Sequence, residues 1–453
     1  MKLTVAHPVS LRSCDRLHGY WVYADDDLEA YSKVKSHFGS ALQPLVAPDE
    51  FQAEASRLHR PFIEWVDRNL AGSPSEDWIT TPLYKNPSNN NFFLHAAWLA
   101  IIKNALTHGR GPLLIVTRSL GLAMTLKSFC KENGVAYEAI GPAALALGRG
   151  RSNFRAWMGF GFNMLQLVYR LVLARLIFGR DYRQRLTELD VLVDTYLFES
   201  DFTDDNRFCD RYFPGLIKWY SKRGFQAASY PYLYRIPISK LSLTYRKMKA
   251  SSTLFVPIEL FLTVTDLFYA AWKCACAAGR RGRLAEPVFL DVNLGPLIKH
   301  LRLQTALWGL YPMLLMLAPR RLGASGIRPK WLVEWYENQP KDKASQIGFK
   351  EIGSPCRVIA TRQYPPHPYY LSLYTTTAEV AAGVAPNENW VCGEASIQIM
   401  SMYDSKGKYR AVPALRYAHL YDEISEIKSE KNLLILLSYA QNDSLGILSS
   451  VIP

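Results

Sequence analysis

One stretch of the chain, residues 331–370, constrains the fold more than any other. It holds two short apolar runs, 331–333 and 357–360, with a helical pattern between them. Such a pattern predicts two neighbouring parallel strands. Because α/β proteins place ligands at the carboxyl ends of parallel strands, we predict a binding site at this edge. The polar residues that follow the two runs are Glu334, Glu337, Asn338, Gln339, Arg362, Gln363 and Tyr364.

A second strand–helix–strand pattern lies at residues 112–139. An apolar run at 112–116 precedes a helical pattern at 120–133, and another apolar run occupies 135–139. Arg118 and Ser119 stand at the start of this helix, where free backbone N–H groups can bind an anion. The sequence contains no GxGxxG motif, so the pattern does not identify a dinucleotide site.

These patterns predict an α/β protein with two Rossmann-like domains. We expect an irregular or helical region at 1–110, where little regular pattern is visible. Residues 111–384 would form the first Rossmann-like domain, with apolar helical insertions at about 150–185 and 245–285. Strand-like runs at 390–393 and 432–437 would open a second domain at 385–453, which this sequence does not complete.

Composition and charge narrow the class of protein. Of the 453 residues, 49% are hydrophobic and 21% charged, which indicates an ordered globular chain. The net charge of +13 favours an anionic partner, namely nucleic acid, anionic lipid or a phosphorylated substrate. We expect no nucleic acid, because the basic residues are scattered or flank apolar runs. Seven irregularly spaced cysteines predict a reduced, cytoplasmic protein without a metal site.

Three apolar stretches, at 158–179, 254–274 and 306–318, are each followed by arginines. A membrane-spanning helix needs roughly 20 apolar residues, and arginines such as Arg170 and Arg175 near its middle are costly. Amphipathic helices lying on an anionic inner leaflet fit better, which predicts a cytoplasmic protein peripheral to the inner membrane. Buried helices of a soluble fold are the open alternative. Glu259 and Asp266, seven residues apart, would share one helix face.

Several segments, in this order, resemble bacterial surface-carbohydrate biosynthesis proteins. They include DRYFPGL at 210–216, EWYENQPKDKA at 334–344, RQYPPHPYYLSLYTT from 362, VCGEA at 391–395 and ALRY at 414–417. Proteins of this family are glycosyltransferases of lipopolysaccharide O-antigen and capsule clusters, with two Rossmann-like domains of GT-B type. The resemblance implies transfer of a sugar from a nucleotide-activated donor, CMP-linked in some relatives, to a growing or lipid-linked glycan. It implies no cofactor.

Glycosyl transfer requires a carboxylate that deprotonates the acceptor or attacks the anomeric carbon, and donors for the leaving phosphate. We predict Glu334 and Glu337 as the carboxylates, provided that the chain turns after Glu334 so that they converge. Asp194, at a predicted strand end, is an alternative nucleophile. Predicted substrate-binding residues are Asn338, Gln339, Arg362, Gln363, Tyr364, His367, Arg118 and Ser119. Predicted donor-binding residues are Gly393, Glu394, Arg416 and Tyr417.

The family pattern and this sequence differ at the second strand end. Relatives often place a histidine where Tyr364 stands, and His367 could replace it only if the proline-rich loop turns back. A structural alternative is that residues 337–339 cap the following helix while Arg362 pairs with Glu334. A functional alternative is a non-catalytic, membrane-associated scaffold of a polysaccharide assembly complex. No HExxH, GxSxG, P-loop or paired CxxC motif supports a protease, hydrolase or NTPase.

Overall fold

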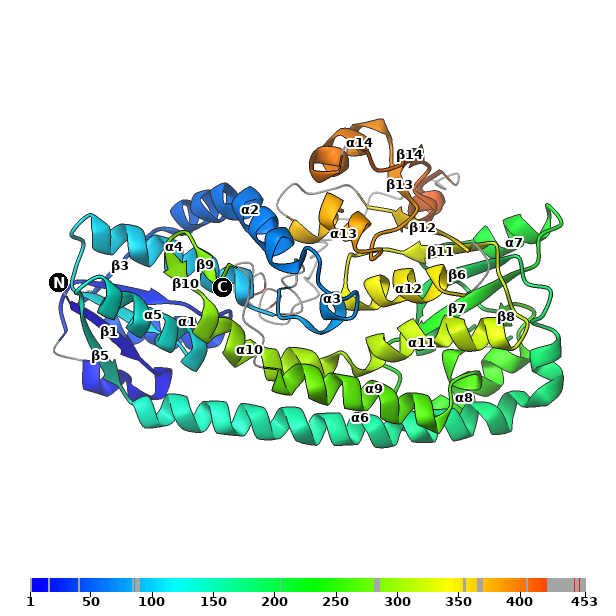
Figure 1. Ribbon diagram of the computed structural model, residues 1–453, viewed down its shortest axis with the longest axis horizontal. Helices are drawn as coiled ribbons and strands as arrows, with labels where there is room; N and C mark the ends of the chain where they lie inside the picture. Colours follow the sequence, from blue (N-terminus) through cyan, green and yellow to red (C-terminus); the bar gives the residue numbers. More distant parts are fainter. Residues whose placement is uncertain are drawn as a thin grey trace, which may run out of the picture.

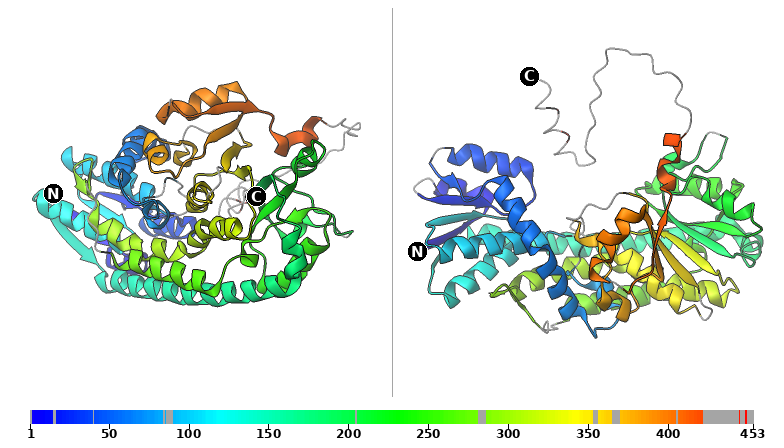
Figure 2. Two further views of the ribbon diagram at one scale, coloured as in Figure 1. Left: turned by 45° about the vertical axis from the view of Figure 1, so that its right-hand side comes forward. Right: turned by 90° about the horizontal axis from the view of Figure 1, so that it is seen from above.

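The computed structural model describes residues 2–421, without 15–16, 40, 84, 86–89, 204, 281–285, 353–355, 365–369 and 405, and also residues 444 and 448. It is an α/β structure with two large parallel sheets, as the sequence predicted. One sheet has five strands and the other seven, and they lie at opposite ends of an elongated molecule (Figures 1 and 2). The predicted strand at 432–437 lies outside the described residues.

The first sheet, in the order β3-β2-β4-β1-β5, is built entirely from residues before 141. Its strands are β1 (Lys2–Ala6), β2 (Tyr20–Tyr23), β3 (Gln43–Pro44), β4 (Leu113–Val116) and β5 (Ala136–Ile140). The helices in the same part of the chain are α1 (Leu28–Phe38), α2 (Pro48–Leu70), α3 (Asp77–Thr80), α4 (Phe92–Thr107) and α5 (Leu120–Glu132). The predicted strand–helix–strand pattern at 112–139 is present as β4, α5 and β5, with β1 inserted between the two strands.

The strands are not grouped as the predicted domains 1–110, 111–384 and 385–453 required. One sheet is built from residues 2–140 and the other from residues 191–412. Residues 1–110, expected to be irregular or helical, supply three of the five strands of the first sheet. These strands are two to five residues long, and β1 is buried at four successive positions. A short strand with no alternation of polar and apolar residues has no two-residue period, so periodicity does not reveal it.

A single helix, α6 (Pro142–Gln184), connects the two sheets and runs along most of the molecule (Figure 1). It is 43 residues long, with non-helical geometry at Gly179, whose φ is +73°. It packs against α8 (Ile238–Ala250), α9 (Val264–Gly279) and α10 (Gly295–Trp308). Within the described residues, α6 alone is long and apolar enough to cross a membrane by length and composition.

The second sheet has the order β14-β13-β12-β11-β6-β7-β8. Its strands are β6 (Val191–Leu197), β7 (Ala227–Leu233), β8 (Leu254–Phe255), β11 (Trp331–Trp335), β12 (Arg357–Arg362), β13 (Glu388–Cys392) and β14 (Tyr409–Val412). The chain builds β6, β7 and β8 outward, then returns to place β11 on the other side of β6. This order is that of a doubly wound sheet, whose switch point lies between β6 and β11.

The predicted parallel pairing of the two strands in 331–370 is confirmed, since Trp331 of β11 lies opposite Arg357 of β12. By contrast, the strand predicted at 390 does not open a new sheet. It is β13, which pairs with β12, and β14 extends the same sheet. Helix α14 (Glu394–Met400) follows β13, as the sequence indicated. Which strands share a sheet depends on backbone pairing between distant segments, and the local pattern does not encode it.

Two of the predicted apolar stretches are largely interior. The stretch 254–274 forms β8, the 3-10 turn η3 (Ile258–Leu260) and the start of α9. Glu259 therefore does not share a helix face with Asp266: it pairs with Arg170 of α6, whereas Asp266 pairs with Arg321 at 2.6 Å. The stretch 306–318 forms the end of α10 and much of α11 (Leu310–Ala324), and most of its side chains are buried.

The remaining elements are short, apart from α12, which follows β11. They are η1 (Pro8–Cys14), η2 (Glu199–Asp201), α7 (Leu216–Ser221), β9 (Val288–Phe289), β10 (Val292–Asn293), α12 (Pro340–Lys350), η4 (Leu371–Leu373), α13 (Thr377–Ala381), η5 (Ser401–Tyr403) and η6 (Leu415–Tyr421). One continuous hydrophobic core reaches from Leu3 and Ile115 of the first sheet to Leu192 and Leu332 of the second. The two halves are thus packed as one body.

Candidate functional site

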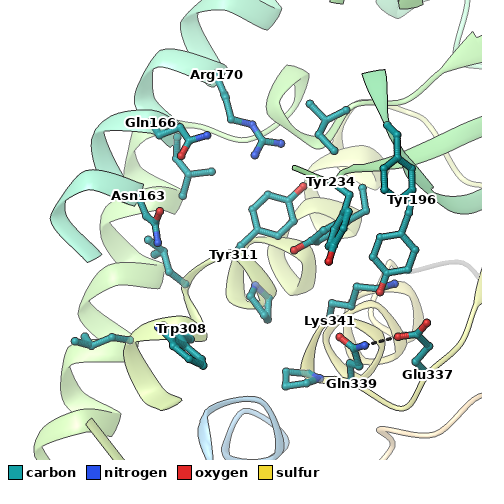
Figure 3. Close-up of a pocket in the computed structure, with 18 of the residues that line it drawn as sticks. Asn163, Gln166, Arg170, Tyr196, Tyr234, Trp308, Tyr311, Glu337, Gln339 and Lys341 are labelled. Atoms are coloured by element: carbon teal, nitrogen blue, oxygen red, sulfur yellow. Dashed lines mark hydrogen bonds between the residues drawn. The ribbon is translucent and has the colours of Figure 1, made fainter. Parts of the chain in front are cut away.

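A cavity of about 630 Å³ lies at the carboxyl ends of β6, β7 and β11 (Figure 3). Helix α6 and the junction of α10 with α11 form its other walls. Because β6 and β11 flank the switch point of the sheet, this is the place where doubly wound proteins bind ligands. The sequence had pointed to the edge between β11 and β12. The cavity instead opens on the other side of β11, toward β6. The order of the strands in the sheet determines this position.

Aromatic rings form much of the cavity wall. They belong to Tyr196, Tyr212, Tyr232, Tyr234, Tyr311, Phe198 and Trp308. The ring of Tyr196 lies 5.3 Å from that of Tyr232, which in turn lies 5.1 Å from Tyr311. Such rings can stack on a sugar or a base, while the tyrosine hydroxyls form hydrogen bonds.

Glu337 presents the carboxylate on the β11 side of the cavity. The chain turns directly after β11, with a positive φ of 55° at Asn338. Asp342 in the first turn of α12 fixes this turn, since its carboxylate accepts hydrogen bonds at 2.9 Å from the backbone N–H groups of Glu337 and Gln339. The Glu337 carboxylate accepts a hydrogen bond from Trp335 Nε1 at 2.9 Å. It accepts another from the Gln339 amide, which Figure 3 shows. It is thus held at the cavity surface.

Lys341 supplies a buried positive charge at the base of the cavity. Its Nζ lies 3.2 Å from Asp194 and 2.8 Å from Asp342, and 4.7 Å from the centre of the Tyr196 ring. Burial acts to lower the pKa of Lys341, but the two carboxylates outweigh it and raise the pKa well above its ordinary value. Burial raises the pKa of Asp194 to about 6, although Lys341 opposes the shift. Near neutral pH the pair is therefore ionised.

Arg170 provides a second positive charge, from α6. It is buried, pairs with Glu259, and lies with its guanidinium carbon 5.2 Å from the centre of the Tyr311 ring. Figure 3 shows it beside Asn163 and Gln166 of the same helix. None of these three residues was predicted as a site residue from the sequence, where Arg170 within an apolar stretch had indicated a helix on a membrane surface. A buried arginine requires a carboxylate partner, and Glu259 in the next apolar stretch was the available clue.

Glu334 and Glu337 do not converge. Their convergence required a turn directly after Glu334, and the structure has no turn there. Strand β11 continues through Trp335, so Glu334 points into the sheet–helix interface, where the Gln346 side chain of α12 donates a hydrogen bond to it. Burial, reinforced by Asp342 and Asp194, raises the pKa of Glu334 well above its usual range. Asp194 lies in the middle of β6 rather than at its end, directly opposite Glu334. Glu334 is therefore fully buried and does not line the cavity.

Asn338 and Arg362 also point away from the cavity. The Asn338 amide donates to the Tyr374 carbonyl at 3.1 Å and accepts from Lys343 at 2.7 Å. Arg362 is 1% exposed and donates to the carbonyl oxygens of Ser372 and Leu373. Arg362 therefore does not pair with Glu334, although the structural alternative predicted this pair. Nor does it reach a position from which it could bind a ligand.

Three further predicted residues gather around the same sheet edge. The Gln363 side chain accepts a hydrogen bond at 2.5 Å from the backbone N–H of Leu415, which fixes η6 over the end of β12. Tyr364 packs against Trp335, with ring centres 5.8 Å apart. Arg416 of η6 is exposed and lies over both Tyr212 and Trp335, at 5.2 and 5.3 Å from the ring centres. The guanidinium of Arg416 therefore lies beside Trp335, which donates to Glu337, and beside Tyr212, which lines the cavity.

The other predicted residues are not at this cavity. Arg118 pairs with Asp27 at 2.8 Å at the end of the first sheet, and Ser119 caps α5. Gly393 and Glu394 lie after β13, and neither they nor Tyr417 are among the described residues that line the cavity. His367 lies outside the described residues. Gln339 occupies the N-cap position of α12, as the structural alternative expected, and lines the cavity as well.

A larger cavity of about 1170 Å³ lies beside the starts of β7 and β8. Its wall carries cations and carboxylates together, among them Arg185, Lys218 and Asp181. Because it lies at the amino ends of the strands, it lacks the sheet position that favours ligand binding. Within the described part of the chain, no cluster of three His, Cys, Asp or Glu residues is arranged to hold a metal ion.

Comparison of the chain with protein-family models, with curated proteins and with solved structures finds no match.

Proposed function

We propose that this protein is a glycosyltransferase of GT-B type. It would move a sugar from a nucleotide-activated donor, with CMP-linked sugars among the candidates, to a lipid-linked or growing surface glycan. The observation that carries the proposal is the cavity at the switch point of the second sheet, which combines a wall of tyrosines in edge-to-face contact with the fixed carboxylate of Glu337. Aromatic rings and carboxylates are the groups that bind sugar rings and their hydroxyls.

In this proposal Glu337 is the general base. A carboxylate on the cavity surface can accept the proton of an acceptor hydroxyl as that oxygen attacks the anomeric carbon. The bond from the anomeric carbon to the donor phosphate breaks, and the phosphate leaves with the electron pair. Lys341 and Arg170 would stabilise the negative charge that develops on the leaving phosphate. Asp194, buried behind Lys341, acts as a positioning residue for that ammonium rather than as the nucleophile.

The tyrosines would hold the sugar, and Arg416 would bind the anionic donor from the rim. Arg416 stacks on Tyr212 and Trp335, which leaves the outward edge of its guanidinium available for a phosphate or carboxylate. Gln339, Asn163 and Gln166 add amide groups that can bind sugar hydroxyls.

The test begins with a screen of nucleotide sugars, CMP-linked donors first, by their effect on the melting temperature of the protein. With a donor that binds, Glu337→Gln should lower the transfer rate by about 10²–10⁴-fold, because the variant cannot take the proton. The matched control is Glu351→Gln, which removes an exposed carboxylate paired with Arg320 on the surface. Its transfer rate should equal that of the wild type.

Two results would contradict the proposal. Undiminished turnover of Glu337→Gln would remove this carboxylate from the mechanism. Failure of every nucleotide sugar to bind would argue against transferase activity and favour the non-catalytic scaffold.

A further inference from the structure

Helix α6 exposes a continuous line of large apolar side chains to solvent. Successive members are three or four residues apart, so they lie on one face of the helix. Their exposed fractions range from 42% for Tyr169 to 77% for Leu176. This apolar stripe extends for about 27 Å along the helix. Its residues are Met158, Phe162, Leu165, Tyr169, Val172 and Leu176.

Positive charge surrounds the stripe. Helix α6 contains seven arginines and a single acidic residue, Asp181, at its far end. Arg151 and Arg155 are exposed before the stripe, and Arg180 is exposed after it. Within the described residues, Arg170 is the only arginine of α6 that pairs with a carboxylate. An apolar face flanked by unpaired cations matches the surface of a bilayer that contains anionic lipids.

The opposite face of α6 fixes the orientation of the helix. There Leu167, Leu171 and Ala174 are buried in the core, and Arg170 forms its buried pair with Glu259. If α6 crossed a bilayer, Arg170 would lose this partner and enter hydrocarbon, which is costly. If α6 instead lies flat on the bilayer, the pair of Arg170 with Glu259 stays intact and lipid still covers the apolar stripe.

We propose that the apolar stripe of α6 is a docking surface for an anionic phospholipid bilayer, on which the helix lies parallel to the membrane plane. The neighbouring helix α9 also exposes large aromatic side chains, with Phe268 at 63% and Trp272 at 58%. Because Asn163 and Gln166 of α6 line the cavity, docking would hold that cavity about one helix diameter, roughly 10 Å, from the lipid surface. The membrane inference stands independently of the proposed transferase activity.

Sedimentation with lipid vesicles tests this inference on the full chain. The protein should bind phosphatidylcholine vesicles that contain phosphatidylglycerol, bind pure phosphatidylcholine vesicles much less, and dissociate as salt rises. The variant Leu165→Glu/Leu176→Glu should lose binding at least about tenfold, because it places two charges in the stripe. Val9→Glu, at an equally exposed position of η1, should bind as the wild type does. Circular dichroism would verify that each variant is folded.

Three outcomes would overturn the inference. The first is equal binding of the wild type and the stripe variant to the acidic vesicles. The second is a dimer of the lipid-free wild type, detected by light scattering, that the stripe variant abolishes, since the stripe would then be an interface between copies. The third is retention of the protein in vesicles after an alkaline carbonate wash, which would indicate a helix that crosses the bilayer.

Discussion

Glu337 and Asp194 illustrate how one sheet sets two carboxylates in different surroundings. Glu337 is half-buried beyond the end of β11, with hydrogen-bond donors from Trp335 and Gln339. Asp194 is 5% exposed in the middle of β6, with the ammonium of Lys341 as its partner. A catalytic base has to reach the substrate, and a buried ion pair does not. Accessibility is therefore the reason why Glu337, and not Asp194, is proposed as the base.

The buried position of Asp194 predicts a pH-dependent stability. Its pKa is about 6 in the folded protein and 3.8 when exposed, so between these values the folded state binds a proton that the unfolded chain lacks. Its contribution to the free energy of unfolding therefore increases as pH falls from about 7 to about 4. Relative to Asp194→Asn, the wild type should gain up to about 3 kcal/mol over that range.

Urea unfolding of both proteins at several pH values measures this difference. Asp49→Asn, an exposed position at the start of α2, provides the control, and its difference from the wild type should stay within about 0.5 kcal/mol throughout. A difference for Asp194→Asn that is flat, or that shrinks as pH falls, would show that Asp194 stays ionised in the folded protein.

At the scale of elements, a buried ion cluster connects the two halves of the molecule. Glu379 of α13 accepts hydrogen bonds from Lys85, which lies between α3 and α4, and from Lys343 of α12. All three side chains are at most 6% exposed. Burial acts to raise the pKa of Glu379, but the two lysines outweigh it and lower the pKa to about 2. Asp67 of α2 adds a further link through Thr376 at 3.0 Å.

Breaking this cluster should be strongly destabilising. Glu379→Gln leaves Lys85 and Lys343 buried without their carboxylate, and we expect a loss of about 3–5 kcal/mol in the free energy of unfolding. The exposed pair of Arg320 with Glu351 gives the comparison: Glu351→Gln should cost no more than about 1 kcal/mol. Chemical denaturation at neutral pH measures both. Similar losses in the two variants would mean that water already reaches the cluster.

At the scale of the whole molecule, the continuous core predicts cooperative unfolding. Ile115 in the first sheet and Leu332 in the second are both fully buried and belong to one hydrophobic cluster. Calorimetry should therefore show one main transition. Ile115→Ala and Leu332→Ala should each lower its midpoint, at a cost of about 2–5 kcal/mol. Two transitions, of which each variant shifts only one, would instead show that the halves unfold independently.

Much of the local structure could be predicted from the sequence. The strands β4, β11 and β12 and the helix α5 appear as apolar runs and helical periods, and their ends lie close to the predicted positions. The polar residues after β11 were correctly located at a sheet edge, and two of them, Glu337 and Gln339, line the cavity. These features depend on neighbours in the sequence, because periodicity and capping are local properties.

The sequence alone therefore determined the α/β class, the position of the polar turn at 337–339 and the apolar, arginine-rich character of α6. Only the tertiary structure decided that β6 lies beside β11, which moved the cavity away from β12 and its buried Arg362. It also decided that Arg170 meets Glu259, 89 residues away. The physical reason is that strand order and burial follow from packing between distant segments. Local periodicity specifies which face of an element is apolar, but not which partner covers that face.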